Sequence, residues 1–186
     1  VNITSIARCF ESYDESPYVY LLQKIQPSSS TQHTILGNFA GQLLDEELHN
    51  SADGQQLPYS ESVASFFHHN ASALLTTPLP DDFHKQAQLQ RDNIHRSIGE
   101  VLPQSVSGFK KENVLLEPSF YSEMLGLQGR MDLLQTDMKV LIEQKSGKGA
   151  FVPGDTDKDT PKPVEQHYVQ MLLYMLLVRY NFPEQY

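Results

Sequence analysis

Two short apolar runs joined by a turn constrain the fold of this chain more than any other feature. They lie in the segment 127–148, which reads LQGRMDLLQTDMKVLIEQKSGK. Residues 127–134 and 139–145 both have the length and apolar content of a β-strand, and a short turn is expected near residues 135–138. The segment therefore predicts an antiparallel hairpin.

This hairpin carries an unusual set of charged residues. Asp132 is expected on the first strand, and Glu143 and Lys145 on the second. If the turn is centred on Asp137 and Met138, facing residues have numbers that sum to 275, and Asp132 lies opposite Glu143. Their Cβ atoms would then be about 4.5–5.5 Å apart. Glu143 and Lys145, two residues apart on one strand, would point to the same side.

Two carboxylates at that distance repel each other unless a positive charge lies between them. A divalent cation that prefers oxygen ligands, Mg²⁺ or Mn²⁺, would satisfy both. Such an ion can lower the pKa of a bound water and bind a scissile phosphate. Lys145 would add a positive charge where negative charge develops. The alternative is a surface hairpin with an ordinary Glu/Lys pair.

The last helix, expected over residues 164–180, has polar side chains on an otherwise apolar sequence. His167, Gln170 and Tyr174 are spaced i, i+3 and i+7, which places them within roughly 60° of one another on one face. Buried polar groups need hydrogen-bond partners, so this face predicts a polar site. The alternative is a buried network without a function.

The rest of the chain is mainly helical in pattern. Apolar spacing predicts helices over residues 36–49, 61–75 and 83–101, the last capped by Asp82 and ended by Pro103, whereas residues 18–25 could form a helix or a strand. Further strands are expected at 114–116 and 120–121, and an exposed loop at 151–163. We expect one α/β or α+β domain over residues 1–186, with a mainly helical part (1–105) and a core (106–186) in which helices flank a small mixed sheet.

Composition excludes several classes of protein. The chain has 14 Lys and Arg against 23 Asp and Glu, a net charge of −9, which excludes a generally basic nucleic-acid-coating protein but not a local basic groove. Cys9 is the single cysteine, so an internal disulfide and a multi-cysteine metal site are excluded and an intracellular location is expected.

No apolar run reaches the roughly 18–20 residues of a membrane span, so no membrane partner is expected. The first residue, Val1, and the end at Tyr186 suggest a fragment of a longer multidomain protein.

Three motifs in order resemble the RecB-like branch of the PD-(D/E)XK nuclease superfamily. They are G-x-x-D at residues 129–132, E-x-K-S-G at 143–147 and Q-x-x-x-Y at 170–174. The likeness covers about residues 114–180 and is strongest to the nuclease domain of helicase–nucleases that trim replication flaps. It implies a restriction-endonuclease-like core.

The resemblance also implies catalytic roles. Asp132, Glu143 and the backbone carbonyl of Gln144 would hold one or two Mg²⁺ or Mn²⁺ ions. Lys145 would position or activate the attacking water. The Q-x-x-x-Y pair would hold the substrate strand or orient the lysine.

Substrate contacts are expected around the same motifs. Ser146, Gly147 and Lys148 would approach the phosphate backbone, where glycine permits close contact. Arg130 and His167 complete the set of expected substrate-binding residues.

The sequence departs from the family pattern at an early helix. Relatives carry a histidine there as a further metal ligand, in a G-x-x-x-H pattern, and Gly41 occupies that position. Asp45, Glu46 or His49 could replace it from later turns. Many relatives also hold an iron–sulfur cluster on four cysteines, which Cys9 alone cannot do, so no cluster is expected.

Three functions remain open from the sequence. The first is a metal-dependent deoxyribonuclease acting on single-stranded or flap DNA in repair, recombination or replication, attached to a helicase or ATPase module. The second is a catalytically degenerate nucleic-acid-binding domain on the same fold. The third is an unrelated soluble interaction domain. Metal binding separates the first from the third, and cleavage that depends on Lys145 separates the first from the second.

Overall fold

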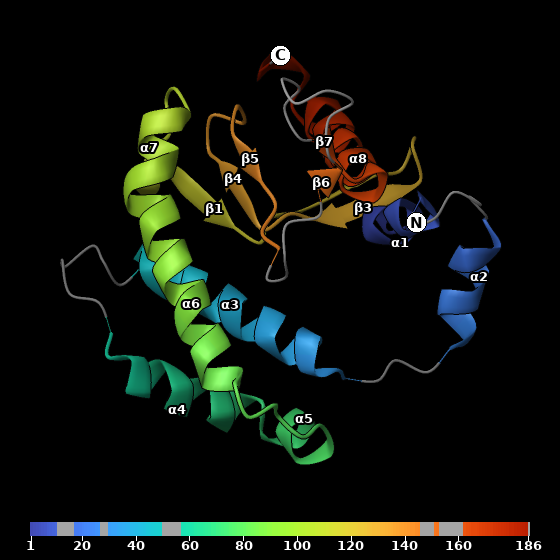
Figure 1. The fold of residues 1–186 in the computed structure, drawn as a ribbon. Coiled ribbons are helices and arrows are strands. Elements are labelled where there is room, and N and C mark those ends of the chain that lie inside the picture. Colours follow the sequence, from blue (N-terminus) through green and yellow to red (C-terminus); the bar gives the residue numbers. More distant parts are fainter. Residues whose placement is uncertain (11–16, 27–29, 50–56, 146–150, 153–161, 186) are drawn as a thin grey trace. The chain divides into compact units, whose positions relative to one another are not determined.

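The computed structural model describes residues 1–10, 17–26, 30–49, 57–145, 151–152 and 162–185. Chain contacts divide the molecule into two compact units, which are described separately. The first unit comprises Val1–Ser28, Glu117–Glu143 and Lys148–Tyr186, and the second comprises Ser29–Leu116 and Gln144–Gly147. Figure 1 shows the helices and strands of both units.

The first unit combines short helices with small antiparallel sheets and one long helix. Its elements are α1 (Ile3–Ala7), a 3₁₀ turn (Arg8–Phe10), α2 (Tyr18–Ile25), β2 (Ser119–Ser122), β3 (Leu127–Arg130), β4 (Leu133–Gln135), β5 (Leu141–Ile142), β6 (Phe151–Val152), β7 (Lys162–Pro163), α8 (Glu165–Asn181) and a final 3₁₀ turn (Pro183–Gln185). Strand β2 pairs with β3, β4 with β5, and β6 with β7, each antiparallel, and a single parallel bridge joins Asn2 to Gln128. This mixture of helices and small sheets confirms the predicted α/β class with a restriction-endonuclease-like core.

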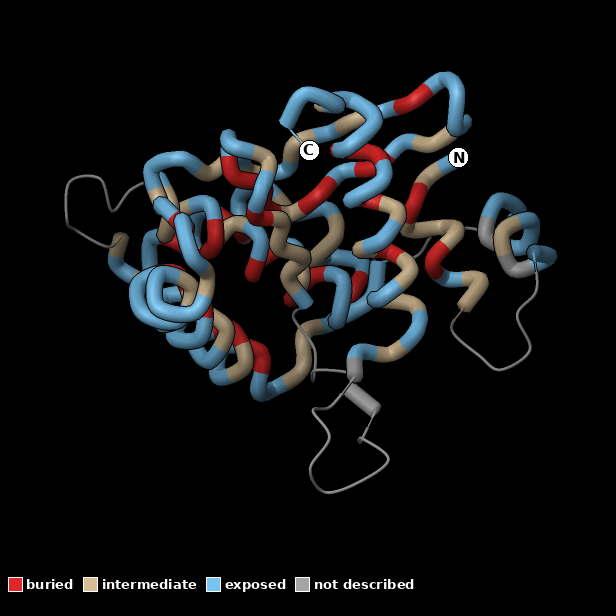
Figure 2. Tube along the Cα trace, turned by 90° about the horizontal axis from the view of Figure 1, so that it is seen from above, coloured by how far each residue is buried: buried red, intermediate tan, exposed pale blue. Residues whose placement is uncertain are grey.

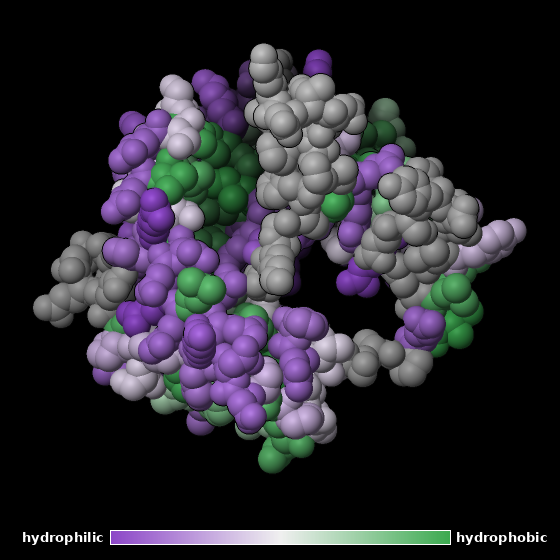
Figure 3. Space-filling view, viewed as in Figure 1, coloured by the Kyte–Doolittle hydropathy of each residue, from purple (hydrophilic) through white to green (hydrophobic). Residues whose placement is uncertain are grey.

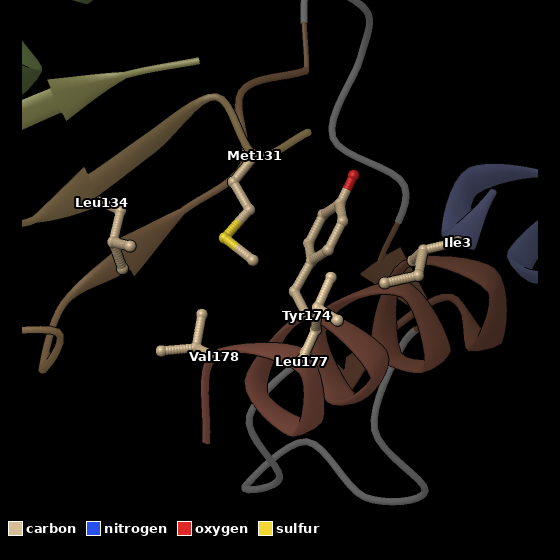
Figure 4. Packing of buried hydrophobic residues seen from close by; sticks show 6 residues of the cluster. All are labelled: Ile3, Met131, Leu134, Tyr174, Leu177 and Val178. Carbon is tan, nitrogen blue, oxygen red and sulfur yellow. The ribbon is translucent and has the colours of Figure 1, made fainter. Parts of the chain in front are cut away.

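The core of the first unit forms where α1 and the strands pack on α8. Buried side chains come from three regions that are distant in sequence; they are Ile3, Met131, Leu134, Tyr174, Leu177 and Val178 (Figure 4). The buried positions of α8 recur at helical spacing, so one side of this helix faces the core. Figure 2 shows buried and exposed positions alternating along the helices.

Helix α2 presents a different surface. Tyr18, Leu21, Leu22 and Ile25 are spaced i, i+3, i+4 and i+7, and each is at least 54% exposed. The apolar side chains of this helix are visible in Figure 3. The open choice between helix and strand at residues 18–25 is thus settled as a helix.

The second unit is mostly helical. Its elements are α3 (Gln32–His49), α4 (Tyr59–His69), α5 (Ala71–Thr76), α6 (Phe83–Arg96), a π-helical turn (Ser97–Val101), α7 (Leu102–Ser105), a 3₁₀ turn (Lys111–Asn113) and β1 (Val114–Leu116). Phe39 of α3 packs against Phe66 of α4, with ring centroids 4.7 Å apart, and against Phe83 of α6 at 6.2 Å. Hydrophilic side chains cover the outward side of α6 (Figure 3).

The structure corrects three predictions for these helices. The single helix expected over residues 61–75 is two helices, because the chain leaves helical geometry at Asn70, whose side chain donates to the carbonyl of Phe66. Asp82 precedes α6 but does not cap it; its carboxylate accepts from Gln86 instead. Pro103 does not end the helix, which continues to Ser105 after a π-helical turn. Pro103 lies at the start of α7, where proline is tolerated.

The strands are also shorter than predicted. The run 127–134 is interrupted at Met131 and Asp132, and the run 139–145 contributes only Leu141–Ile142 to a strand. The expected loop 151–163 begins and ends in the β6–β7 pair, and its residues 153–161 lie outside the described residues. The strands at 114–116 and 119–122 and the long last helix agree with the predictions.

Among the described residues, no helix combines the length and apolarity needed to cross a membrane.

Candidate active site

The β4–β5 hairpin has the predicted register. Leu133 pairs with Ile142 and Leu134 with Leu141, so the numbers of facing residues sum to 275. The turn closes through a hydrogen bond from the amide of Gln135 to the carbonyl of Val140, 2.9 Å long. Met138 within the turn has a positive φ of 61°, which is uncommon for a residue other than glycine.

Asp132 and Glu143 lie directly next to the last paired residues of this hairpin, Leu133 and Ile142. Neither lies within a strand, which corrects the sequence prediction: Asp132 comes just before β4, and Glu143 just after β5. The backbone carbonyl of Asp132 accepts a 3.0 Å hydrogen bond from the amide of Glu117. This bond holds Asp132 between β3, which pairs with β2, and β4, which pairs with β5.

Helix α8 supplies a polar partner of the Glu143 carboxylate. Gln170 and Tyr174, one helical turn apart, are buried, with exposed fractions of 2% and 1%. The side-chain amide of Gln170 donates to Oε1 of Glu143 at 2.6 Å and to the Tyr174 hydroxyl at 3.1 Å. The Tyr174 hydroxyl in turn donates to the backbone carbonyl of Arg130 at 2.8 Å. One hydrogen-bonded chain therefore links the E-x-K motif, the Q-x-x-x-Y motif and the end of β3.

The environment of Tyr174 reports on both carboxylates. Its pKa is raised above the ordinary value, mainly by burial and then by the negative charge of Glu143. Hydrogen bonds from Gln170 and Thr4 oppose the rise in pKa, and the charge of Asp132 adds to it. The negative charges of both carboxylates therefore add to the rise in the Tyr174 pKa.

Gln144 and Lys145 follow Glu143 directly in the chain. Gln144 is half-buried and Lys145 is exposed. Strand β5 ends at Ile142, so the strand alternation that predicted a shared side for Glu143 and Lys145 does not extend to them. The expected substrate-binding residues Ser146, Gly147 and Lys148 lie outside the described residues.

The two other expected substrate-binding residues, Arg130 and His167, lie close in sequence to the residues of this hydrogen-bonded chain. Arg130 is exposed at the end of β3, and its guanidinium forms a surface ion pair with Glu117 at 3.2 Å. Exposed pairs of this kind contribute about 0–1 kcal/mol to stability. His167 lies half-buried in the first turn of α8, one turn before Gln170.

The candidates for an additional metal ligand all lie on α3, in the second unit. Gly41 is part of this helix, and a Cβ added there would meet no atom within 4 Å. Asp45 is paired with His49 at 2.7 Å. Glu46 accepts hydrogen bonds from Gln42 and from the buried Ser62 hydroxyl. Within the described residues, no group of three or more His, Cys, Asp or Glu side chains is arranged to hold a metal ion.

Cys9 of the first unit is half-buried, and its thiol donates to the carbonyl of Ser5 at 3.5 Å. This is the packing of a small polar side chain at the end of a short helix.

Sequence reasoning missed the residues that hold Tyr174 in place. A Cβ on Gly129 would lie 2.7 Å from Cε1 of Tyr174 and 3.0 Å from Cδ1 of Ile3. Tyr174 rises from α8 between Met131 and Ile3 (Figure 4). The G-x-x-D motif contained a signal for this contact, since a glycine inside a strand often marks a close approach. The first residues of the chain carried no such signal.

One comparison with known proteins found a match to a family. The model of the PD-(D/E)XK nuclease superfamily matches residues 7–185, which is nearly the whole chain. No curated protein and no solved structure matched the sequence. Members of this superfamily are usually nucleases that use divalent metals, so membership indicates a hydrolase that acts on nucleic acid. This match over nearly the whole chain identifies the chain as a member of the PD-(D/E)XK nuclease superfamily.

Proposed function

We propose that this chain is a divalent-metal-dependent deoxyribonuclease that hydrolyses phosphodiester bonds in single-stranded or flap DNA. The observation that carries the proposal is the position of Glu143. It directly follows Ile142, the partner of Leu133, whereas Asp132 directly precedes Leu133, and Gln170 holds the Glu143 carboxylate through a 2.6 Å hydrogen bond. An orienting hydrogen bond behind a carboxylate is the usual support of a metal ligand.

The donor set fits Mg²⁺ or Mn²⁺. Two carboxylate oxygens and a backbone carbonyl are hard ligands, and Mg²⁺ commonly takes one or two carboxylates together with waters and a substrate phosphate. Asp132, Glu143 and the carbonyl of Gln144 would hold the ion. When bound, the ion would lower the pKa of a water and stabilise charge on the scissile phosphate.

Three protein side chains would carry the remaining roles in the reaction. Lys145 would orient the attacking water and stabilise developing negative charge. Gln170 orients the Glu143 carboxylate, a more specific role than holding the substrate strand. The Tyr174 hydroxyl accepts a second hydrogen bond from the Gln170 amide and donates one to the carbonyl of Arg130 at the end of β3.

The substrate and biological setting follow from the motifs. Arg130, His167 and the segment Ser146–Gly147–Lys148 would contact the DNA backbone, and contacts of this kind make binding sensitive to salt. The resemblance to the RecB-like branch favours an intracellular role in repair, recombination or replication, beside a helicase or ATPase module in the full-length protein. No iron–sulfur cluster is part of this proposal.

A catalytically degenerate DNA-binding domain is the second candidate. It is favoured by Gly41, which stands where relatives carry a histidine ligand, and by the small number of acidic ligands at the described site. The presence of Asp132, Glu143 and Lys145 together favours the nuclease.

Cleavage assays separate these candidates. End-labelled single-stranded and flap DNA would be incubated with the chain in Mn²⁺, Mg²⁺ or EDTA, and the same assays repeated with Lys145→Ala. The nuclease predicts metal-dependent cleavage that falls at least about 100-fold in Lys145→Ala, with an unchanged melting temperature because Lys145 is exposed. Salt-sensitive binding without cleavage would favour the degenerate domain, and full activity of Lys145→Ala would contradict the proposed role of this lysine.

A further inference from the structure

Glu117 has a backbone conformation that is unusual for a glutamate. Its φ angle is 47°, in the left-handed region, where the Cβ of an L-residue crowds the backbone and glycine is the usual residue. It also precedes Pro118, and a proline favours an extended conformation in the residue before it. Residues held in strained conformations concentrate at functional sites. A strained glutamate at this position therefore points to a function for its carboxylate.

The backbone of Glu117 is bound to the segment that contains Asp132. Its amide donates a 3.0 Å hydrogen bond to the carbonyl of Asp132. The next carbonyl, that of Pro118, accepts a 3.1 Å hydrogen bond from the amide of Met131. The backbone of Glu117 is thus fixed beside a residue that is expected to hold the metal ion.

The carboxylate of Glu117 contacts a residue that is expected to bind the substrate. Its Oε2 atom lies 3.2 Å from Nη1 of Arg130, and the side chains of Glu117 and Arg130 are 58% and 66% exposed. An exposed pair of this kind is weak, because water screens it. A guanidinium binds carboxylates and phosphates through the same N–H donors. A DNA phosphate that reached Arg130 would therefore compete with Glu117 for these donors.

We propose that Glu117 regulates DNA binding at the candidate active site by competing with the DNA backbone for Arg130. In the DNA-free protein, the carboxylate neutralises the guanidinium. When DNA binds, Arg130 exchanges the carboxylate for a phosphate, and the carboxylate is left to the solvent. This inference rests on the proposed function, in which Arg130 contacts the DNA backbone. It adds control of that contact by a residue outside the three motifs.

The exchange changes how DNA binding depends on salt. Each cationic side chain that binds a phosphate of single-stranded DNA releases counterions and adds about 0.7 to the slope of log Kd against log salt concentration. At Arg130 this release is offset, because the displaced Glu117 carboxylate attracts a cation from solution. The Arg130 contact should therefore contribute little to the slope while Glu117 is charged.

Two variants separate the local charge of Glu117 from the total charge of the chain. Glu117→Gln removes the charge with little change in size and leaves in place the amide that bonds to Asp132. Glu123→Gln is the matched control, because Glu123 is an exposed acid between β2 and β3 of the same unit, and its substitution changes the net charge equally.

Binding is measured without cleavage. Fluorescein-labelled oligo(dT) would be titrated with each protein in EDTA over a range of salt concentrations and followed by fluorescence anisotropy. We expect Glu117→Gln to bind about 2- to 5-fold more tightly at low salt, with a slope steeper by about 0.7. Glu123→Gln should keep the wild-type slope.

A double-mutant cycle with Arg130→Gln tests the route of the effect. Arg130 is exposed, and its backbone carbonyl can still accept from Tyr174 in this variant, so the melting temperature should stay unchanged. Arg130→Gln alone should weaken binding. If Glu117 acts through Arg130, Glu117→Gln has no further effect on Kd or on the slope in the Arg130→Gln background.

The nuclease and the inference fail in different measurements. Absence of cleavage by the wild type in Mg²⁺ and Mn²⁺ overturns the proposed function, and absence of DNA binding overturns both. Equal slopes of Glu117→Gln and Glu123→Gln overturn only the inference, as does an Arg130→Gln variant that binds as tightly as the wild type. An effect of Glu117→Gln that persists without Arg130 also overturns it, since it would report general charge. A steeper slope that requires Arg130 supports it.

Discussion

The side-chain amide of Gln170 donates a 2.6 Å hydrogen bond to the carboxylate of Glu143, across 27 residues of sequence. An amide held by a buried helix turn is a rigid donor, and it limits the carboxylate to one orientation. The metal-binding role proposed for Glu143 therefore depends on α8 as much as on the hairpin.

Glu143→Gln should abolish cleavage without unfolding the protein. Glutamine has nearly the same volume, and its carbonyl oxygen can still accept from Gln170, but it lacks the charge that binds a cation. We expect at least a 100-fold loss of activity, equivalent to about 2.7 kcal/mol. Mn²⁺ binding measured by calorimetry should weaken in parallel. Glu184→Gln, at an exposed position of the C-terminal 3₁₀ turn, is the control and should cleave normally.

Gln170→Glu should make stability depend on pH in the acid range. The new carboxyl would be buried beside Glu143, and two carboxyls at hydrogen-bond distance favour sharing one proton. The pKa of the pair in the folded state would rise above the unfolded value, so the destabilisation is largest at neutral pH and shrinks as the pH falls. Thermal melts at pH 5 and pH 8 would measure this difference. An equal loss at both pH values would contradict the buried pair, and the exposed Gln185→Glu is the control.

Gly129→Ala should destabilise the first unit. The added methyl would lie 2.7 Å from the Tyr174 ring, so the ring or the strand must move. Overpacking of this kind costs about 1–3 kcal/mol. Gly99→Ala is the matched control, because a Cβ there meets nothing within 4 Å. Urea unfolding of both variants would give the comparison, and equal stabilities would show that Tyr174 adjusts easily.

Tyr174→Phe should lower stability and remove part of its loss in alkali. The substitution leaves the carbonyl of Arg130 without its hydroxyl donor and costs about 1–2 kcal/mol at neutral pH. The folded protein raises the pKa of Tyr174, so its contribution is present below the ordinary tyrosine pKa of about 10 and is lost as the pH rises through the folded value. Melting temperatures between pH 8 and pH 11 should therefore fall less steeply in Tyr174→Phe than in the wild type. Parallel curves would contradict this assignment.

The local pattern of the sequence was sufficient to predict the hairpin and the last helix. Alternation and turn residues placed the β4–β5 register correctly, because apolar pairs such as Leu134 and Leu141 must share a face. Helical spacing likewise placed Gln170 and Tyr174 on one buried side of α8. The strand ends at Asp132 and Glu143 were predicted less well, since strand length depends on pairing partners that a local pattern does not reveal.

Tertiary structure alone decided which residues meet at the candidate site. Gln170 contacts Glu143, and Gly129 accommodates the ring of Tyr174, although these residues come from three separate segments. Periodicity reports which side of an element is buried, but it contains no information about the element that will cover that side. The sequence by itself thus determined the local elements and the chemical types of the candidate residues, whereas packing between distant segments determined their contacts.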